Sequence, residues 1–146
     1  MFFFQLAFAE VAVSLDDFAF IHRLWEEWSP TWEFAADDIA PVIETLTADG
    51  VLASTLGYYR ALFNPDFSQD RYAVDQARGG EARPIVVPSL HLHGDMDGCI
   101  GHELLAGMSD HYPAGLELKV LPNLGHFLHR EDPNWVSRLI VDFISK

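Results

Sequence analysis

Two segments of the sequence combine imidazole and carboxylate side chains with glycine. The first is His91–Cys99, which contains Asp97, and the second is Gly125–His129, which contains His126. If the fold brings Asp97 to His126, the carboxylate can fix the tautomer of the ring while the other ring nitrogen acts as a general base. The structural alternative is a turn in which Asp97 bonds its own backbone and a loop in which a carbonyl bonds His126. Spacing alone leaves both interpretations open.

Both segments follow a predicted β-strand. The strands are expected at residues 89–93 and 116–120, with a short helix near 103–109 between them. Strand and helix in alternation predict an α/β fold with parallel pairing. Ligands of open α/β sheets bind beyond the carboxyl ends of the strands, where Asp97 and His126 fall. Two strands are few for a parallel sheet that is buried on both faces, so the pattern predicts part of a larger α/β protein.

Helical patterns dominate the first half of the sequence and close the chain. The expected helices are one that starts with a Ser14–Asp17 capping box and stops before Pro30, one near residues 38–48, one near 51–63, and a last one with Asp132 as N-cap and Pro133 in its first turn. The polar stretch 66–84, which contains Gly79-Gly80, is the predicted linker.

Composition excludes several classes of partner. The chain has 146 residues, 49% of them hydrophobic, and 9 Lys and Arg against 22 Asp and Glu give a formal net charge of −13. We therefore expect no nucleic acid and no membrane partner, since both need clustered basic side chains. The apolar start has no basic residue before Arg23, which a secretory signal would need. With Cys99 as the single cysteine, the expected location is cytoplasmic.

Four segments, taken in order, resemble the α/β-hydrolase superfamily. His93–Ile100 after a strand, and Leu124–Leu128 before the capped last helix, are similar to its acid and histidine elements. Phe2–Leu6 and Tyr58–Arg60 resemble the cap of the epoxide hydrolase and haloalkane dehalogenase-like branch. The resemblance covers essentially the whole chain.

This resemblance implies the fold class α/β, as the C-terminal portion of an α/β-hydrolase. It places a helical cap in residues 1–65, a connector in 66–84, and the C-terminal part of the core in 85–146, with the last two parallel strands and their flanking helices.

The resemblance also implies roles for individual residues. His126 would activate water or the nucleophile and Asp97 would orient His126, whereas Asp95 is expected to be a solvated loop residue. Tyr59 matches the cap tyrosine that donates a hydrogen bond to the epoxide oxygen; its alternative is a core aromatic. The partner tyrosine of the family aligns with Phe4, which has no donor. The implied substrate of the full-length relative is a small hydrophobic epoxide, halide or ester, with no cofactor and no metal.

The nucleophile of the family is missing from this sequence. The family places Asp or Ser on a Gly-x-Asp-x-Gly or Gly-x-Ser-x-Gly elbow before the cap, and neither motif occurs in these residues. The upstream oxyanion loop is absent too. Since losing the nucleophile of a triad removes most of the rate, the chain alone is expected to be inactive, with Met1 an internal methionine of a protein about twice as long.

Two other functions stay open at this point. The first is a metal-dependent hydrolase that uses His91, His93 and Asp95, which are similar to the His-x-His-x-Asp-His signature of metallo-β-lactamase-like hydrolases, although Met96 occupies the place of its last histidine. The second is a non-catalytic fragment or split half. Such a chain would form homo-oligomers or pair with a complementing N-terminal half through its exposed sheet edge and apolar faces.

Overall fold

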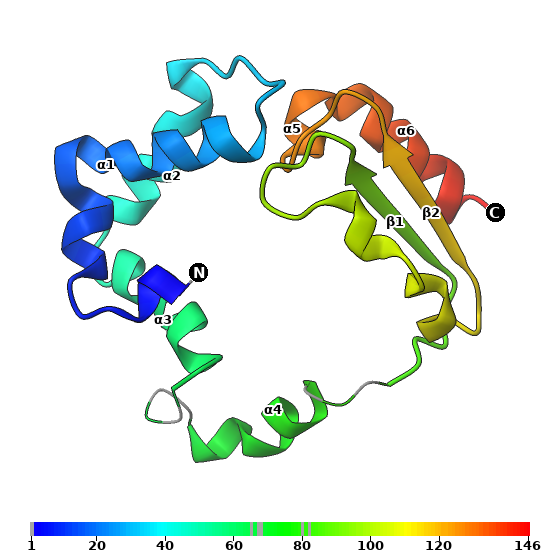
Figure 1. Cartoon of the computed structure of the whole chain (residues 1–146), viewed down its shortest axis with the longest axis horizontal. Helices are drawn as coiled ribbons and strands as arrows, with labels where there is room; N and C mark the ends of the chain where they lie inside the picture. Colours follow the sequence, from blue (N-terminus) through cyan, green and yellow to red (C-terminus); the bar gives the residue numbers. More distant parts are fainter. Residues whose placement is uncertain (1, 65, 67–68, 80, 82) are drawn as a thin grey trace. The chain divides into compact units, whose positions relative to one another are not determined.

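The structure is a computed structural model that describes residues 2–64, 66, 69–79, 81 and 83–146. Its contacts divide the chain into two compact units (Figure 1). Unit 1 comprises residues 1–23 and 34–82, and unit 2 comprises 24–33 and 83–146. The predicted boundaries after residues 65 and 84 stay predictions. Within the predicted linker, Phe67, Ser68, Gly80 and Ala82 lie outside the described residues.

Unit 1 is built from helices around an apolar cluster. Its elements are a 3₁₀ helix η1 (Phe2–Gln5), most of α1 (Ala9–Trp28), α2 (Ala36–Thr47), α3 (Val51–Ala61), a 3₁₀ helix η3 (Asp70–Tyr72) and α4 (Ala73–Gly79). Phe4, Val13, Phe18 and Leu56 are buried together at its centre. The predicted linker therefore contains helical structure, because residues 70–79 form η3 and α4.

The predicted capping box at Ser14 is wrong. The helix already begins at Ala9, and the Ser14 hydroxyl donates to the carbonyl of Val11 at 3.3 Å instead of capping a later turn. The chain then kinks, and Asp16, Asp17 and Phe18 have φ of 51°, 54° and 60°. Aspartate tolerates this left-handed region better than most residues. Phe18, which does not, is 6% exposed in the core of unit 1, so packing holds it there.

Unit 2 contains the sheet. Its elements are the end of α1, β1 (Ser89–Gly94), the 3₁₀ helices η4 (His102–Leu105) and η5 (Met108–His111), β2 (Leu116–Leu121), α5 (Leu128–Glu131) and α6 (Pro133–Ile144). Two 3₁₀ turns thus replace the single helix predicted near 103–109. Leu121, Leu124 and Val136 form the buried cluster through which α6 packs on the sheet (Figure 1).

The strand pairing is parallel, as predicted. Ser89 lies opposite Leu116, and the register runs to Gly94 opposite Leu121. Both strands therefore end at the same edge of the sheet. The last helix also begins as predicted, because Asp132 accepts a hydrogen bond from the backbone N–H of Trp135 at 2.9 Å and Pro133 occupies the first turn.

Within the described residues, no single helix is long and apolar enough to cross a membrane. The pair α2 and α3, which is bent by 86°, would meet that requirement of length and composition together.

Candidate active site

The two predicted catalytic residues, Asp97 and His126, follow the carboxyl ends of β1 and β2. The chain leaves β1 at Gly94 and turns through Asp97, and it leaves β2 at Leu121 and reaches His126 after a short loop. The backbone N–H of Asp95 donates to the carbonyl of Leu121 at 3.0 Å. The N–H of Met96 donates to Leu124 at 3.0 Å. These bonds hold the two loops side by side.

The structure brings Asp97 and His126 into contact. Nδ1 of His126 lies 2.9 Å from Oδ2 of Asp97. An ionised carboxylate only accepts hydrogen bonds, so Nδ1 carries the proton and donates it to Asp97. The other ring nitrogen, Nε2, has no hydrogen-bond partner among the described residues, and the side chain is 29% exposed. A neutral imidazole in this tautomer can take a proton at Nε2.

Asp97 is buried but well supplied with donors. Its side chain is 6% exposed, and its Oδ1 accepts the backbone N–H groups of Cys99 at 2.8 Å and Ile100 at 2.9 Å. Burial raises the pKa of this carboxyl, but the hydrogen bonds from Ile100, His126 and Cys99 outweigh it and hold the pKa below its ordinary value. Asp97 is thus both a turn residue that bonds its own backbone and the partner of His126, and the two interpretations of the sequence coexist.

Asp97 also affects its neighbour Cys99. Burial, and the negative charge of Asp97 after it, raise the pKa of the Cys99 thiol. The thiol is therefore held in its protonated form, which is a poor nucleophile. Cys99 does not replace the nucleophile that the sequence lacks.

A single carbonyl joins the loop of Asp97 to the loop of His126. The carbonyl oxygen of Trp28, at the end of α1, accepts the N–H of Gly98 at 3.1 Å and the N–H of His126 at 3.0 Å. The Trp28 ring also meets the His126 ring edge to face, with centroids 5.0 Å apart. The segment Leu24–Glu33, which belongs to unit 2, is therefore part of this site. Sequence reasoning missed it, since Ser29-Pro30 signals only the end of a helix.

Asp95 has a structural task that the sequence did not predict. Its Oδ1 accepts the backbone N–H of Asn123 at 2.7 Å. Asn123 has a φ of 59°, in the left-handed region that asparagine tolerates. Asp95 is therefore a partly exposed loop residue that also braces the loop leading to His126.

Phe4 and Tyr59 contact each other in unit 1. Their ring centroids are 4.8 Å apart, Phe4 is 8% exposed, and Tyr59 packs against the core of the unit. No described residue forms a hydrogen bond with the Tyr59 hydroxyl. Tyr59 thus lies beside Phe4, and it also has the core packing expected in the alternative interpretation.

Arg60 fixes the segment that carries Phe4. Its guanidinium donates to the carbonyls of Phe4 at 3.0 Å and Leu6 at 3.2 Å, and it pairs with both carboxylate oxygens of Glu10 at 2.6 and 3.0 Å. The hydrogen bond from Arg60 lowers the pKa of Glu10. Bidentate pairing of this kind sets orientation as well as attraction.

The three residues of the metal hypothesis do not form a metal site. The ring of His93 stacks on that of His91 at 5.7 Å, as expected for alternate residues of one strand, but Nε2 of His93 lies 2.9 Å from the carbonyl oxygen of Ile100. Asp95 is bonded to Asn123. Burial, and the neighbouring His93, lower the pKa of His91. Within the described part of the chain, no group of three or more His, Cys, Asp or Glu is placed to hold a metal ion.

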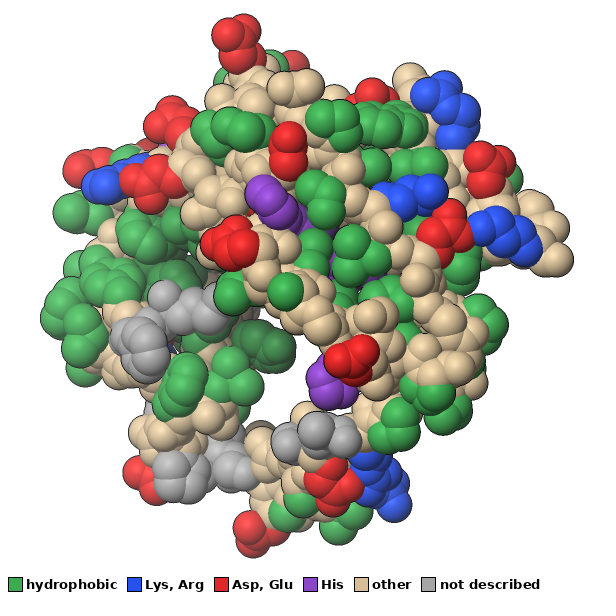
Figure 2. Space-filling view, turned by 45° about the vertical axis from the view of Figure 1, so that its right-hand side comes forward, with side chains coloured by type: hydrophobic (Ala, Val, Ile, Leu, Met, Phe, Trp, Pro, Cys, Tyr) green, Lys and Arg blue, Asp and Glu red, His purple; other side chains and the backbone are tan. Residues whose placement is uncertain are grey.

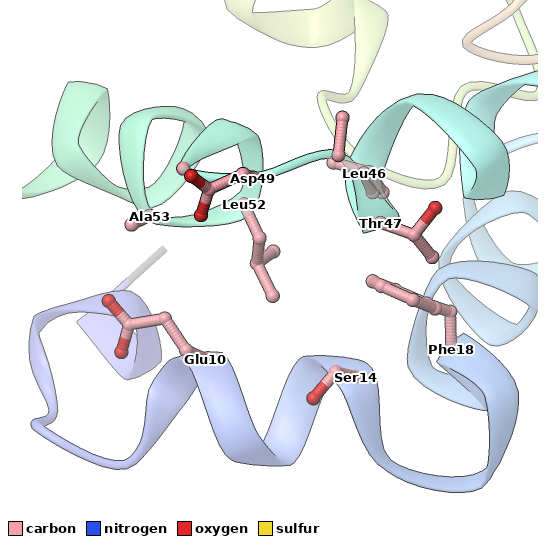
Figure 3. Close-up of a pocket in the computed structure, with 10 residues that line it drawn as sticks. Glu10, Ser14, Phe18, Leu46, Thr47, Asp49, Leu52 and Ala53 are labelled. Atoms are coloured by element: carbon pink, nitrogen blue, oxygen red, sulfur yellow. The ribbon is translucent and has the colours of Figure 1, made fainter.

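A pocket of about 460 Å³ lies in unit 1 (Figure 3). Leu52 of α3 projects into it, the carboxylate of Glu10 comes from α1, and that of Asp49 comes from the turn between α2 and α3. Neither Tyr59 nor Phe4 lines it.

Fold and site together define a class: the chain carries part of an α/β-hydrolase fold. A solved candidate epoxide hydrolase from Klebsiella pneumoniae is similar to it with a TM-score of 0.84 and 25% identity, over 97% of this chain and 47% of that one. An N-acyl homoserine lactone degrading enzyme shares the fold with a TM-score of 0.55 and 19% identity, over 94% of this chain and 51% of that one.

The relatives by sequence point the same way. The chain is 25% identical over 154 residues to epoxide hydrolase 3 of Xenopus tropicalis, and the match covers 100% of this chain and 38% of that protein. No family model matches the chain. It is therefore related to α/β-hydrolases of the epoxide hydrolase kind, and it spans less than half the length of this curated relative.

Proposed function

We propose that this chain supplies the acid and the histidine of an epoxide hydrolase-like enzyme, with Asp97 orienting His126 and His126 acting as general base. The hydrogen bond of 2.9 Å between Nδ1 of His126 and the buried carboxylate of Asp97 carries this proposal. It leaves Nε2 available at the edge of the sheet where ligands of this fold class bind.

The pair works through the charge of Asp97. The carboxylate fixes His126 in the tautomer with a proton on Nδ1, and it stabilises the imidazolium that forms when Nε2 takes a proton. In an enzyme with an Asp nucleophile, His126 would activate the water that hydrolyses an alkyl ester intermediate. In one with a Ser nucleophile, it would activate the serine and then the water that hydrolyses the acyl-enzyme.

The substrate class rests on the relatives and on Tyr59. We propose a small hydrophobic epoxide, with a halide or an ester as alternatives. Tyr59 would donate its hydroxyl hydrogen to the epoxide oxygen, and Phe4, 4.8 Å away between ring centroids, would supply only an apolar surface. One donor in place of two predicts weaker activation of the leaving oxygen.

The chain alone is proposed to be inactive or nearly so. Neither nucleophile motif occurs in its residues, and the pKa of Cys99 is raised rather than lowered. A polypeptide that supplies the nucleophile is therefore the proposed partner in catalysis. The cytoplasmic location stays a prediction.

The test is complementation by the solved relative. The portion of the Klebsiella protein that this chain does not match is fused to the chain, and epoxide, haloacid and p-nitrophenyl ester hydrolysis are measured. We expect turnover by the fusion and none above background by either part alone. Turnover by this chain alone, lost in His126→Ala, would contradict its proposed inactivity.

Variants of the fusion test the roles of the two residues. His126→Ala and Asp97→Asn should each lower kcat by about 10³-fold or more, the range seen when triad members are removed. His129→Ala is the matched control, because this exposed histidine lies three positions away and should leave kcat within about twofold. A fusion that is active but indifferent to His126→Ala would refute the assignment.

A further inference from the structure

The backbone N–H groups of residues 125–127 donate to residues that no sequence motif indicated. The N–H of Gly125 points at both carboxylate oxygens of Glu131, at 3.0 and 2.9 Å. The N–H of His126 donates to the carbonyl of Trp28 at 3.0 Å. The N–H of Phe127 donates to the hydroxyl oxygen of Ser29 at 2.9 Å. These three consecutive N–H groups thus find their acceptors on the carboxylate of Glu131 and on the segment of residues 27–31, which we call the strap.

Ser29 and Glu131 form one network. The Ser29 hydroxyl donates to Oε1 of Glu131 at 2.8 Å, so the same oxygen atom that holds Phe127 is itself held by the carboxylate. Ser29 is 0% exposed, and Thr31, which is more exposed, donates to the other oxygen of Glu131 at 2.9 Å. A buried hydroxyl that both donates and accepts is fixed in one rotamer.

The backbone approach is close enough to require glycine at residue 125. A Cβ at this position would lie 2.5 Å from Cα of Ser29 and 2.8 Å from its Oγ. The backbone of the strap at Ser29 is therefore in direct contact with the backbone of the His126 loop at Gly125.

We propose that Ser29 and Glu131 are positioning residues that hold the His126 imidazole on Asp97. This inference rests on the proposed function of His126 as general base. A histidine on a free loop would sample several ring orientations, whereas productive geometry has to be held within about 0.5 Å and 10–20° by surrounding contacts. The network supplies these contacts from the backbone side, and Asp97 supplies the hydrogen bond to the ring.

The test reads the tautomer of His126 directly by long-range ¹H–¹⁵N correlation on the full chain with labelled histidine, assigned with His126→Gln. In the unmodified chain we expect His126 with its proton on Nδ1. In Ser29→Ala and in Glu131→Gln we expect the Nδ1–H form to become a minority and exchange of this proton with water to rise about tenfold, as for the loss of one hydrogen-bonded anchor.

Two controls separate positioning from mere stability. Leu139→Ala removes packing of α6 on the sheet without touching the loop, so it should lower Tm and leave the tautomer unchanged. Thr31→Val removes only the hydrogen bond from Thr31 to Oε2 of Glu131, and Glu131 keeps its bonds to Ser29 and Gly125. It should therefore also leave the tautomer unchanged. A tautomer that shifts equally in Leu139→Ala, or that stays unchanged in Glu131→Gln, overturns the proposal.

The tautomer measurements do not depend on enzymatic activity. If the fusion were inactive, the proposed function would be refuted, but a tautomer shift in Ser29→Ala and Glu131→Gln would still support the positioning role. If Ser29→Ala does not fold, Glu131→Gln, which keeps the shape of the side chain, decides the question.

Discussion

The electrostatics of the candidate site depend on one carboxyl group, because Asp97 is buried and still has to stay charged. Three hydrogen bonds offset the cost of burying this charge: two from the backbone N–H groups of Cys99 and Ile100 and one from His126. Hydrogen bonds to a charged acceptor contribute about 1.5–3 kcal/mol each. The same interactions link the folding stability of this region to the ionisation of Asp97.

Because Asp97 has a lowered pKa in the folded state, we predict that its contribution to the unfolding free energy is lost in acid. Burial raises the pKa of Asp97, and the bonds from Ile100, His126 and Cys99 lower it by more, so the folded-state value is below the ordinary 3.8. A group with a lowered pKa stabilises the fold above its unfolded pKa, and that stability is lost as the pH falls through the folded value. We expect Asp97→Asn to lower the unfolding free energy by about 2 kcal/mol near neutral pH, and by progressively less below about pH 4.

Urea unfolding across pH measures this difference. Asp110→Asn is the matched control, because Asp110 is exposed, and its difference from the unmodified chain should be small at every pH. A difference for Asp97→Asn that stays constant from neutral pH into acid would contradict the linkage.

The sequence was sufficient for the residues whose task is local or that lie at strand ends. Asp132 and Pro133 start α6 as predicted, because capping depends on neighbours in sequence. Asp97 and His126 meet because parallel strands end at one edge of a sheet. Ser29 and Glu131 could not be found in this way, since they are 102 positions apart and neither has a local signature.

At the scale of elements, the end of α1 is the least expected part of the site. Its first part belongs to the helical unit, and residues 24–28 belong to the unit of the sheet. Helical periodicity predicted the helix but not the kink at residues 15–18, because packing of Phe18 determines that backbone. The strap, which includes the last two residues of α1, is held by contacts of its backbone, and such contacts cannot be recognised from the pattern of side chains.

Because the backbone of the strap lies against residue 98, we predict that this position tolerates only glycine. A Cβ there would overlap the carbonyl oxygen of Glu27, and a backbone oxygen cannot rotate away as a side chain can. We expect Gly98→Ala to lower the unfolding free energy by about 1–3 kcal/mol, the usual cost of overpacking. The unfolding free energy is measured by chemical denaturation. The ¹H–¹⁵N signals of the labelled His126 ring report local changes at the site.

Gly57→Ala is the matched control for Gly98→Ala, because it adds the same methyl group at a glycine that has space for it. Gly57 lies inside α3 with nothing within 4 Å of its added Cβ, so alanine should stabilise the helix by about 0.5–1 kcal/mol. If Gly98→Ala were as harmless as Gly57→Ala, the close approach of the strap to the loop would be wrong.

At the scale of the whole molecule, apolar surface and charge oppose each other. Leu118 and Val120 on β2 are 37% and 38% exposed, and Ile144 at the end of α6 is 72% exposed. Figure 2 shows hydrophobic side chains exposed on the viewed face among acidic ones. Each strand of the described sheet is paired on one edge only. Such edges and faces favour association, while a net charge of −13 makes copies of the chain repel one another.

We therefore predict self-association that salt strengthens. Added NaCl shortens the range of charge repulsion to about 10 Å at 0.1 M and about 3 Å at 1 M, while burial of apolar surface is not screened. Light scattering at micromolar concentration should give a mass above 16.4 kDa that rises with salt. Val120→Glu should weaken association, and Val74→Glu on α4, with the same change of charge at a side chain 65% exposed, should weaken it less. A compact monomer at every salt concentration would contradict the prediction, because the exposed faces would then be too weakly apolar to bring two chains together even when their charges are screened.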